Sequence, residues 1–425
     1  MGNAPDTGSA SPGRPLDGVR VLALEQMQAV PFATQLLARL GADVVKIEPL
    51  RGESARAAQP AMIDEAGRPA GATFLRYNLG KRSVAVDLGS ERGRDLVLRL
   101  AESFDVLAEN LGPGRADRLG LGYDVLSARN PRLIYLSITG FGRTPVDSPY
   151  RNWPAYASVA EAMSGIYEYS RRPHQPPVIN PVGGLGDNAT GMFGVIGVLA
   201  ALRQRDRTGR GQLIDIAMLD SMLSVCDIVT NFWSMGIRNE PDTERRVPYL
   251  LQPFRSRDGW CLLQVIRPHQ FERLARLLGR EEWLGDERFA TGFGWFDNWE
   301  GTIRPVVEAW AADRTMFEAA QALAEAGVAA APCSRPADVV ADPHVASRNM
   351  LVEIPRPDGV EQPVLVPGNP VKMSGLAEQP QTRPPLLGEH TVSVLAEELG
   401  LSAEEIAELT AAGVIASDSP AAPAA

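Results

Sequence analysis

Residues 19–47 read VRVLALEQMQAVPFATQLLARLGADVVKI. The apolar, β-branched runs at 19–24 and 44–47 predict two buried strands. The segment between them, with Pro31 near its start and Gly41 after its end, predicts a helix. A strand, a helix and a second strand form a βαβ unit, whose strands lie parallel.

The same alternation continues along the first half of the chain. Runs at 83–88, 105–108 and 132–138 predict further strands, and helical patterns at 91–103 and 123–128 separate them. Strands that alternate with helices form a mostly parallel sheet, so we predict a doubly wound, Rossmann-like α/β domain. Ligands of such sheets bind at the carboxyl ends of the strands.

The middle of the chain predicts a second, smaller domain. A polar stretch at 238–244 precedes a predicted strand at 259–265, and helical patterns follow at 269–278, 302–311 and 316–326. This mixture indicates an α+β domain.

Composition restricts the classes of function. The chain has 425 residues, enough for two domains, and its 44% hydrophobic and 22% charged residues are typical of a soluble globular enzyme. A net charge of −10 argues against nucleic acid as a partner, because phosphate binding needs a basic surface. The three cysteines have no metal-ligand spacing, so we expect reduced thiols, no metal and a cytoplasmic location. Cys333 is expected to lie in the core.

The two ends of the sequence predict disordered segments, a leader at 1–14 and a tail at 417–425, both rich in small residues and proline. The leader lacks the apolar core of a signal peptide. The longest apolar stretch, 192–202, is about half the length that a bilayer span requires, so no membrane is expected as a partner.

The stretch GGLGDNATGM at 183–192 holds the residue most suited to chemistry, Asp187. Glycines let the backbone approach a ligand and expose amide donors at the start of a helix. A carboxylate among these donors stays ionised at neutral pH and can act as a nucleophile. The alternative is that Asp187 or Asn188 only caps the helix, which is the commoner role of such residues.

The segment GDNATGM and the following RDRTGRGQLIDIAMLDS at 205–221 resemble the core signature of the family III CoA-transferases, of the formyl-CoA and carnitine type. Further motifs agree in the same order: PLDGVRVLAL, NLGKRSVAVDL, AENLGPGRADRLGLGYDVL and, near the end, PPLLGEHTVSVLAEEL. The resemblance therefore covers nearly the whole chain.

The resemblance implies a catalytic role for Asp187, which would attack the thioester of an acyl-CoA, and places Gln28 near the reacting carboxylate. Gln28 can equally be a polar loop residue that satisfies local backbone groups. The acyl-CoA donor and a small carboxylic acid acceptor would be the substrates, with no tightly bound cofactor. The family also implies an interlocked, ring-like homodimer. The implied domains are a large CoA-binding domain at 15–225, a small domain at 226–333, and a linker that returns to the large domain at 334–416.

The resemblance also implies residues that bind CoA. The matching positions are Asn110, Gly112, Gly114 and Arg118, and further candidates for phosphate contacts are Lys81 and Arg82. Each of these basic residues can also be an ordinary solvated side chain. Pro49 stands where the family often has a basic residue, so Arg51 or Arg56 is expected to take that contact.

Two further features bear on the substrate. The glycine-rich lid of formyl-CoA transferases is absent at 247–257, which disfavours a formyl/oxalate pair. A basic cluster before Asp187 could bind the carboxylate of the acid or could be plain surface; it comprises Arg171, Arg172 and His174.

Two other functions were weighed against CoA transfer. Racemases of the α-methylacyl-CoA type resemble this sequence but pair their Asp with a His, because proton exchange at an α-carbon needs an acid and a base. Asn152 occupies the histidine position here and has no suitable pKa. A non-catalytic CoA-binding protein is the third possibility, and the retention of Asp187 among glycines argues against it.

Overall fold

A computed structural model of the chain describes residues 13–64, 66–144, 148–169, 171–179, 183–236, 246–376 and 382–417. Most of the predicted leader (1–14) and tail (417–425) lies outside these residues. The chain forms two compact units. The described part of the first lies within 13–171, 176–236 and 349–417, and that of the second comprises 172–175 and 246–348.

The first unit is built on a seven-stranded sheet with the order β14-β5-β2-β1-β6-β7-β8. The strands are β1 (Arg20–Leu24), β2 (Asp43–Glu48), β5 (Arg82–Val86), β6 (Val106–Glu109), β7 (Ile134–Thr139), β8 (Leu213–Ala217) and β14 (Ile415–Ala416). Val21 of β1 is in register with Val44 of β2 and Val106 of β6, both in parallel pairs. Only β14 pairs antiparallel within this sheet of described residues. The predicted mixed α/β fold with a mostly parallel sheet is therefore confirmed.

The order of the parallel strands identifies where a ligand would bind. Counted along the chain, these strands run 3-2-1-4-5-6, as in dinucleotide-binding sheets. The order reverses between β1 and β6, because the connection after β1 leads to one side and that after β6 to the other. Leu24 and Glu109, at the carboxyl ends of β1 and β6, are in register, and the chain leaves these two ends in opposite directions, which is where open α/β sheets bind ligands.

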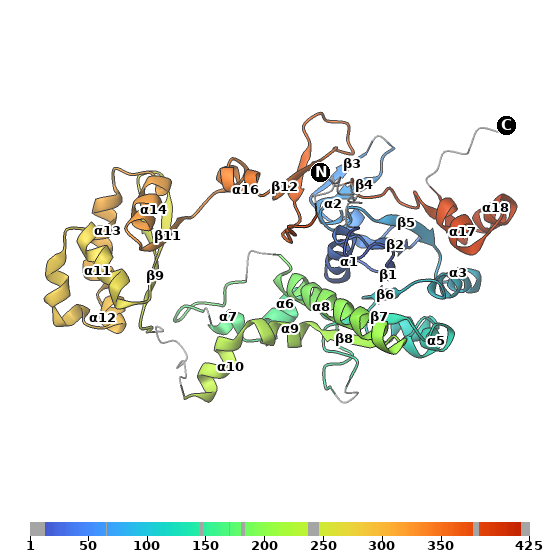
Figure 1. Cartoon of the computed structure of the whole chain (residues 1–425), viewed down its shortest axis with the longest axis horizontal. Helices are drawn as coiled ribbons and strands as arrows, with labels where there is room; N and C mark the ends of the chain where they lie inside the picture. Colours follow the sequence, from blue (N-terminus) through green and yellow to red (C-terminus); the bar gives the residue numbers. More distant parts are fainter. Residues whose placement is uncertain are drawn as a thin grey trace, which may run out of the picture. The chain divides into compact units, whose positions relative to one another are not determined.

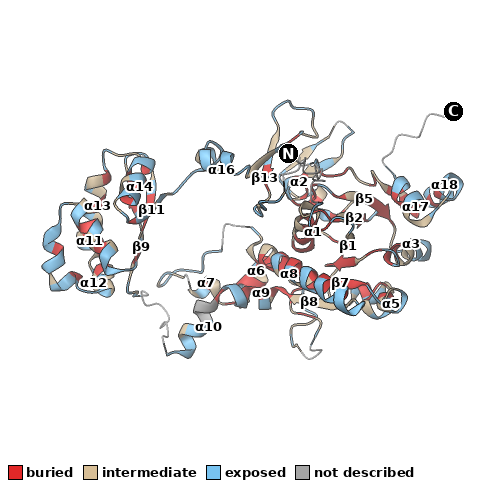
Figure 2. Cartoon of the chain, in the orientation of Figure 1, coloured by how far each residue is buried: buried red, intermediate tan, exposed pale blue. Residues whose placement is uncertain are grey.

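Helices cover both faces of the sheet. Four lie on one face: α1 (Ala29–Arg39), α6 (Ala157–Met163), α8 (Leu185–Thr208) and α9 (Met218–Val225). Four lie on the other: α3 (Glu91–Ala101), α5 (Tyr123–Arg129), α17 (Thr391–Leu399) and α18 (Ala403–Ala411). Figure 2 shows the strands buried and each helix exposed on its outer side. Two separate apolar cores therefore hold the layers together.

The C-terminal segment belongs to the first unit. In Figure 1, α17 and α18 lie beside the strand β5 and the helix α3, far away in the sequence. Ile415 of β14 pairs with Val86 of β5, and the Thr391 hydroxyl accepts from the backbone N–H of Ala85 at 3.1 Å. The end of the chain thus completes one edge of the sheet.

Smaller elements complete the first unit. They are the turn η1 (Ser54–Arg56), the hairpin β3 (Ala61–Ile63) and β4 (Pro69–Gly71), the helices α2 (Ala72–Tyr77), α4 (Arg115–Arg118), α7 (Ile166–Tyr169) and α10 (Asp227–Ser234), and the hairpin β12 (Leu351–Ile354) and β13 (Val364–Pro367).

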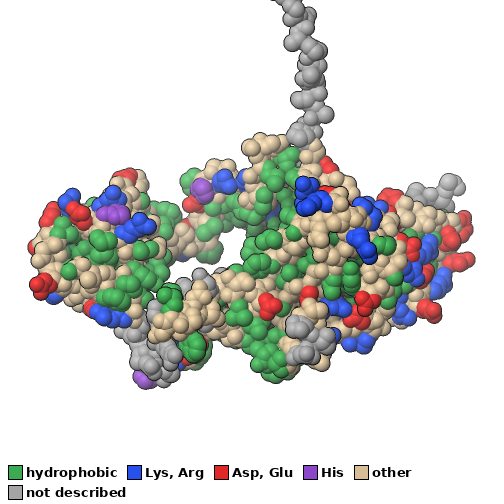
Figure 3. All heavy atoms as spheres, turned by 60° about the horizontal axis from the view of Figure 1, so that its bottom comes forward, with side chains coloured by type: hydrophobic (Ala, Val, Ile, Leu, Met, Phe, Trp, Pro, Cys, Tyr) green, Lys and Arg blue, Asp and Glu red, His purple; other side chains and the backbone are tan. Residues whose placement is uncertain are grey.

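On the face shown in Figure 3, acidic and basic side chains of the described residues are interspersed and do not gather into one basic patch.

The second unit has a three-stranded antiparallel sheet in the order β11-β10-β9. Its elements are β9 (Leu250–Arg255), β10 (Trp260–Val265), α11 (Pro268–Leu277), η2 (Glu281–Gly285), η3 (Glu287–Phe289), α12 (Gly292–Asp297), η4 (Trp299–Ile303), α13 (Arg304–Ala311), α14 (Met316–Glu325), β11 (Ala329–Pro332), α15 (Pro336–Val340) and α16 (Pro343–Ser347). Aromatic side chains fill its core; Phe271 stacks on Trp295 with ring centroids 4.8 Å apart. Residues 226–236 belong to the first unit, so the second unit begins later than the predicted boundary at 226.

Helix α8 contacts α1 through small residues. A methyl group on Gly191 would lie 2.8 Å from the carbonyl oxygen of Ala29 and 3.0 Å from Phe32, so glycine is required for this approach. By length and composition alone α8 could cross a membrane, but half of its most apolar window is buried in the unit. Burial against α1 and the sheet explains its apolar composition.

We expect Gly191→Ala to destabilise the protein by about 1–3 kcal/mol, because the added methyl would press on the backbone of α1. Gly194→Ala is the matched control in the same helix. Its methyl would meet the tips of the Leu136 and Ile138 side chains at 3.2 and 3.4 Å, which can shift. Since alanine favours helix, Gly194→Ala should be neutral or stabilising. Urea unfolding of both variants checks this, and an equal effect would contradict the close α1–α8 contact.

Candidate active site

Asp187 and Gln28 converge at the start of α8. Gly184, with a φ of +83°, directly precedes the helix, and Asp187 is its third residue. A methyl group on Gly184 would lie 1.9 Å from Oε1 of Gln28 and 3.3 Å from Oδ2 of Asp187. The two side chains therefore face the same small space, which only a glycine leaves open.

The capping interpretation of Asp187 and Asn188 is wrong. Gly184 occupies the N-cap position of α8, and glycine has no side chain to cap the helix. The Asn188 side-chain oxygen instead accepts a hydrogen bond from the Tyr77 hydroxyl at 3.0 Å. Asn188 thus links α8 to α2, and the Asp187 carboxylate remains available for chemistry.

The surroundings of Asp187 raise its pKa. Burial is the main cause and the nearby carboxylate of Glu161 the second, and together they bring the pKa of Asp187 to about 6. This pKa agrees with the prediction that Asp187 is ionised at neutral pH, although burial and Glu161, not the helix start, determine it. Above pH 6 Asp187 is nevertheless ionised, and a more basic carboxylate is a better nucleophile.

Glu161, in α6, was not recognised in the sequence. Its side chain is buried, and Oε1 accepts a hydrogen bond from the backbone N–H of Gly186 at 2.9 Å. The Tyr167 hydroxyl donates to Oε2. Glu161 therefore fixes the first turn of α8 next to Asp187. No sequence motif marks this contact, because it joins residues 25 positions apart.

The loop after β1 carries Gln28 and is held on both sides. The Asn110 side chain accepts from the backbone N–H of Gln26 at 3.0 Å and donates to its carbonyl at 2.9 Å. The N–H of Met27 donates to Oε2 of Glu53 at 3.0 Å. Met27 has a φ of +58°, which costs a residue other than glycine about 1–3 kcal/mol. The structure thus gives Asn110, a predicted CoA contact, hydrogen bonds to this loop.

A buried set of charges lies beneath the same loop. Nζ of Lys81 is 2.6 Å from Oε1 of Glu25, and Nζ of Lys46 is 3.4 Å from Glu25 and 3.2 Å from Glu53. All four side chains are almost completely buried. Burial lowers the pKa of Lys81 to about 8. Lys81 is therefore not placed to meet a phosphate, which corrects the sequence prediction: its ammonium is used inside the protein.

Arg82 is also unsuited to a phosphate contact. It is the first residue of β5, so it lies at the amino end of a strand, opposite to the edge where ligands bind. Its Nε donates to Asp43 at 3.0 Å, and Nη1 lies 3.2 Å from Glu397. The guanidinium of Arg82 is therefore paired with carboxylates inside the protein. This corrects the prediction that Arg82 contacts a CoA phosphate.

A cavity of about 160 Å³ lies at the carboxyl ends of β1, β2, β5 and β6. Its lining is mostly apolar and includes Gln26, from the loop described above; the other lining residues are Leu24, Glu25, Ile47, Pro49, Glu53, Val86, Asp87, Leu88, Gly89, Leu111, Arg115 and Leu119. This position, at the reversal of strand order, is where open α/β sheets bind ligands.

The turn beside this cavity has the predicted glycines. Gly112 and Gly114 adopt φ values of +93° and +62°, which other residues rarely adopt. Arg115 lines the cavity, whereas Nη1 of Arg118 donates to the carbonyl of Pro113 at 3.3 Å and folds over Gly114. The motif predicted Arg118 as the contact and not Arg115, although both arginines belong to it.

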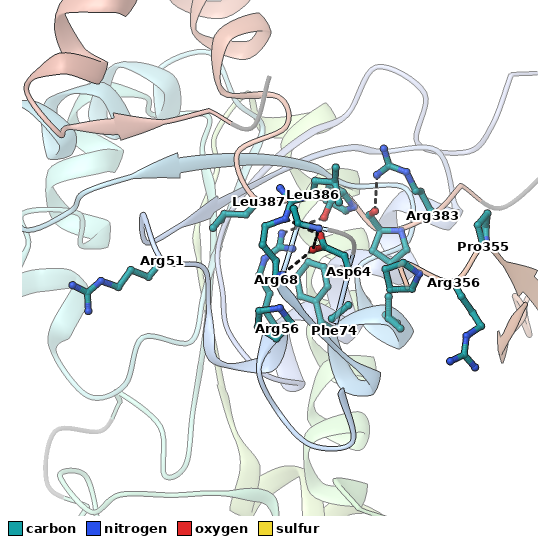
Figure 4. A pocket seen from close by; sticks show the side chains of 17 residues that line it. Arg51, Arg56, Asp64, Arg68, Phe74, Pro355, Arg356, Arg383, Leu386 and Leu387 are labelled. Atoms are coloured by element: carbon teal, nitrogen blue, oxygen red, sulfur yellow. Dashed lines mark hydrogen bonds and ion pairs between the residues drawn. The ribbon is translucent and has the colours of Figure 1, made fainter. Parts of the chain in front are cut away.

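A second cavity, of about 520 Å³, lies between α2 and the segments 355–357 and 383–387 (Figure 4). Arg56 lies over Phe74 and donates twice to Glu48 at 2.7 Å, so it is not free for a CoA phosphate. Arg51 points away from the group around Arg56 and Asp64 in Figure 4. Arg51 and Arg56 were the two candidates to replace the basic residue that the family often has at the position of Pro49. Of these two arginines, only Arg51 is exposed.

The remaining candidates lie elsewhere. Arg171 is 2.8 Å from Glu168, while Arg172 and His174 belong to the second unit. Cys333 is exposed, so its prediction as a core residue is wrong; it follows the edge strand β11. Among the described residues, no group of three acidic, Cys or His side chains could hold a metal ion.

The sequence profile of CoA-transferase family III matches residues 16–391. The chain belongs to this family. Succinyl-CoA:mesaconate CoA-transferase from Haloarcula hispanica is 34% identical over 389 residues, which cover 90% of this chain and 96% of that protein. Formyl-CoA:oxalate CoA-transferase from Streptomyces avermitilis is 32% identical over 428 residues, which cover 94% and 99%. A CAIB/BAIF family protein from Brucella suis shares the fold, with a TM-score of 0.79, 34% identity and coverage of 91% and 100%.

Membership of family III confirms the predicted family and its CoA-transferase activity. A CoA-transferase acts on CoA thioesters, so a CoA thioester is a substrate here.

We expect Asp187→Asn to stabilise the protein at pH 7.5 by about 2 kcal/mol, because the raised pKa means that ionised Asp187 opposes folding. A group whose pKa is higher in the folded state contributes stability that is lost as pH rises through about 6. The difference between the two proteins should therefore shrink as the pH falls from 7.5 to 4. Urea unfolding across this range measures it, and a difference independent of pH would contradict the raised pKa.

Proposed function

We propose that this CoA-transferase moves CoA from an acyl-CoA to a small carboxylic acid through a covalent intermediate on Asp187. One observation carries the proposal: the partly buried Asp187 carboxylate and the Gln28 carboxamide face a common space at the start of α8. The first-turn N–H of Gly186 donates to Glu161, and other first-turn N–H groups, which lack partners within the helix, can stabilise an oxyanion. Gln28 can add donors from its amide.

In the first half-reaction the Asp187 carboxylate attacks the thioester carbonyl, and the C–S bond breaks as CoA leaves as its thiolate. The thiolate then attacks the Asp187 carbonyl of the mixed anhydride, releases the donor acid and leaves CoA as a thioester on Asp187. The acceptor carboxylate repeats these steps in reverse, which yields the new acyl-CoA and restores the Asp187 carboxylate. The covalent route thus divides one difficult transfer into several easier steps.

We place the nucleotide end of CoA in the cavity at the carboxyl ends of β1, β2, β5 and β6. Its apolar walls suit a purine ring, and the glycine turn at 112–114 allows close approach of the backbone. Arg115 and Arg118, with Arg51 in place of the base missing at Pro49, are the proposed phosphate contacts. The acids Glu25 and Glu53 in this lining are neutralised by lysines.

We propose a short dicarboxylic acid as the acceptor. The relatives named above act on mesaconate or oxalate, both dicarboxylates, with succinyl-CoA or formyl-CoA as the donor. Of the predicted basic cluster, only Arg171 belongs to the same unit as Asp187, and it stays the candidate for the second carboxylate. Mass detection of new thioesters from a panel of donors and acids identifies the pair.

We also propose a cytoplasmic homodimer. Met192, Ile196 and Leu199 form an exposed apolar stripe on α8, at the spacing of one helix face. Such a stripe suits contact with a second copy of this chain. Interlocking of the two copies is part of the proposal, and sedimentation of the purified protein tests the dimer.

The racemase alternative lacks its second proton-transfer group, since Asn152 is exposed and not ionisable near neutral pH. Exchange of an α-proton of acyl-CoA with deuterium in D₂O, without CoA transfer, would revive this alternative.

Incubation with an accepted acyl-CoA and hydroxylamine should convert Asp187 of the wild type to a hydroxamate. The reason is that both the anhydride and the enzyme–CoA thioester react with this nucleophile. Peptide mass analysis locates the modification, and Asp187→Ala supplies the control that cannot form it. Turnover without any adduct, or an adduct at another residue, would overturn the covalent role of Asp187.

The kcat/KM for acyl-CoA, which reports the free enzyme, should fall as the pH drops through about 6, because protonated Asp187 cannot attack. Glu161→Gln removes the neighbouring charge and keeps a side chain that can accept from Gly186. The acid limb of the pH–rate profile should therefore move to lower pH. Tyr123→Phe, remote from this carboxylate, is the control. An unmoved limb would show that Glu161 does not influence Asp187.

A further inference from the structure

We infer that Glu53 is a positioning residue for the reaction: its carboxylate holds Met27 in the left-handed conformation that turns Gln28 toward Asp187. The inference rests on the proposed role of Asp187. It is carried by three observations, which concern the backbone of Met27, the contacts of Glu53 and the burial of the Gln28 side chain.

The backbone at Met27 is held in a conformation that its own residue type disfavours. Met27 has a φ of +58°, and the following residue, Gln28, directly precedes α1. Without an external contact, a methionine here would relax toward negative φ. Such a change would rotate the following peptide group and direct the Gln28 side chain elsewhere.

Glu53 is the contact that opposes this relaxation. Its Oε2 accepts hydrogen bonds from the N–H groups of Met27, at 3.0 Å, and Ala55, at 2.8 Å. Its Oε1 is 3.2 Å from the ammonium of Lys46, a residue of β2. These three contacts and the burial of the side chain fix the orientation of the carboxylate.

The Gln28 side chain is where this orientation has its effect. Oε1 of Gln28 is buried and has no hydrogen-bond partner among the described residues, although buried acceptors are generally satisfied. It faces the space next to Oδ2 of Asp187. We infer that the Gln28 carboxamide is oriented to hydrogen-bond a bound substrate, because it lacks this bond in the substrate-free protein.

The other end of the loop is fixed independently. Asn110 makes two hydrogen bonds to the backbone of Gln26, one residue before Met27. Gln26 is therefore held by β6, and Met27 by the segment after β2. With both held, the direction of Gln28 depends on the torsion angles of Met27 and hence on Glu53.

The test compares Glu53→Ala with Glu48→Ala. Glu48 is a buried carboxylate at the end of β2. Its oxygens accept from Arg56, Ser83 and, at 3.4 Å, the backbone N–H of Glu53, and from no residue of the loop after β1. Both variants lose a buried ion pair, so both should unfold at lower urea concentration. Only Glu53→Ala should reduce kcat, by about 10- to 100-fold, with little change in KM for acyl-CoA.

A rescue separates positioning from loss of stability. Glycine adopts positive φ without strain, so Met27→Gly supplies the left-handed turn without the Glu53 carboxylate. The double variant Glu53→Ala/Met27→Gly should recover kcat several-fold over Glu53→Ala, at unchanged or lower stability. If Glu53→Ala does not fold, Met27→Gly and Asn110→Ala, which leave the buried charges paired, are measured in its place. Asn110→Ala should then lower kcat by loosening the same loop.

Equal losses of kcat in Glu53→Ala and Glu48→Ala, or no rescue by glycine in a folded double variant, would overturn the inference. Hydroxylamine trapping of the wild type is run in parallel, so that the two proposals can fail separately. Wild-type protein that forms the Asp187 adduct beside a Glu53→Ala variant that forms it as fast contradicts the positioning role alone. Wild-type protein that turns over without an adduct contradicts the covalent mechanism.

Discussion

Asp187, the proposed nucleophile, has to be shielded from water and still carry a negative charge, and its surroundings fit this requirement. Burial of the carboxylate raises its pKa to about 6, which leaves it ionised at neutral pH and more basic than an aspartate in solvent. Such a group opposes folding, so the rest of the unit must supply the stability. Two apolar cores, one on each face of the sheet, provide it.

The buried charged groups next to the site contribute defined geometry, whereas the apolar cores contribute stability. Buried ion pairs contribute little net stability, because desolvation offsets their attraction, but they do have defined geometry. Lys46 joins Glu25 at the end of β1 to Glu53 in the segment after β2, and Lys81 joins Glu25 to the start of β5. These ion pairs hold the end of β1, the segment after β2 and the start of β5 in one arrangement. Apolar contacts are less directional and would fix these three segments less well.

The sequence was sufficient to predict the pattern of the sheet and the position of Asp187 near the start of a helix, and insufficient to predict the residues that surround them. Alternating apolar runs predict parallel strands because their period is local, and the glycine-rich motif marks the start of α8. Lys81 and Arg82 were misplaced because a residue type does not tell whether a side chain faces a ligand or an internal carboxylate. Glu161 and Glu53 act across 25 and 26 positions, and no local pattern encodes such contacts.

The loop after β1 connects the two ends of the proposed CoA site through one residue. Gln26 lines the cavity at the strand ends, Gln28 faces Asp187, and only Met27 lies between them. CoA is long, and contacts with its remote nucleotide can be used to lower the barrier of the chemical step only if they are coupled to the reacting end. A rigid, left-handed Met27 provides such a coupling, since any adjustment of Gln26 to the nucleotide is passed to Gln28 through two torsion angles. The strained residue therefore fits a site in which binding at one end prepares reaction at the other.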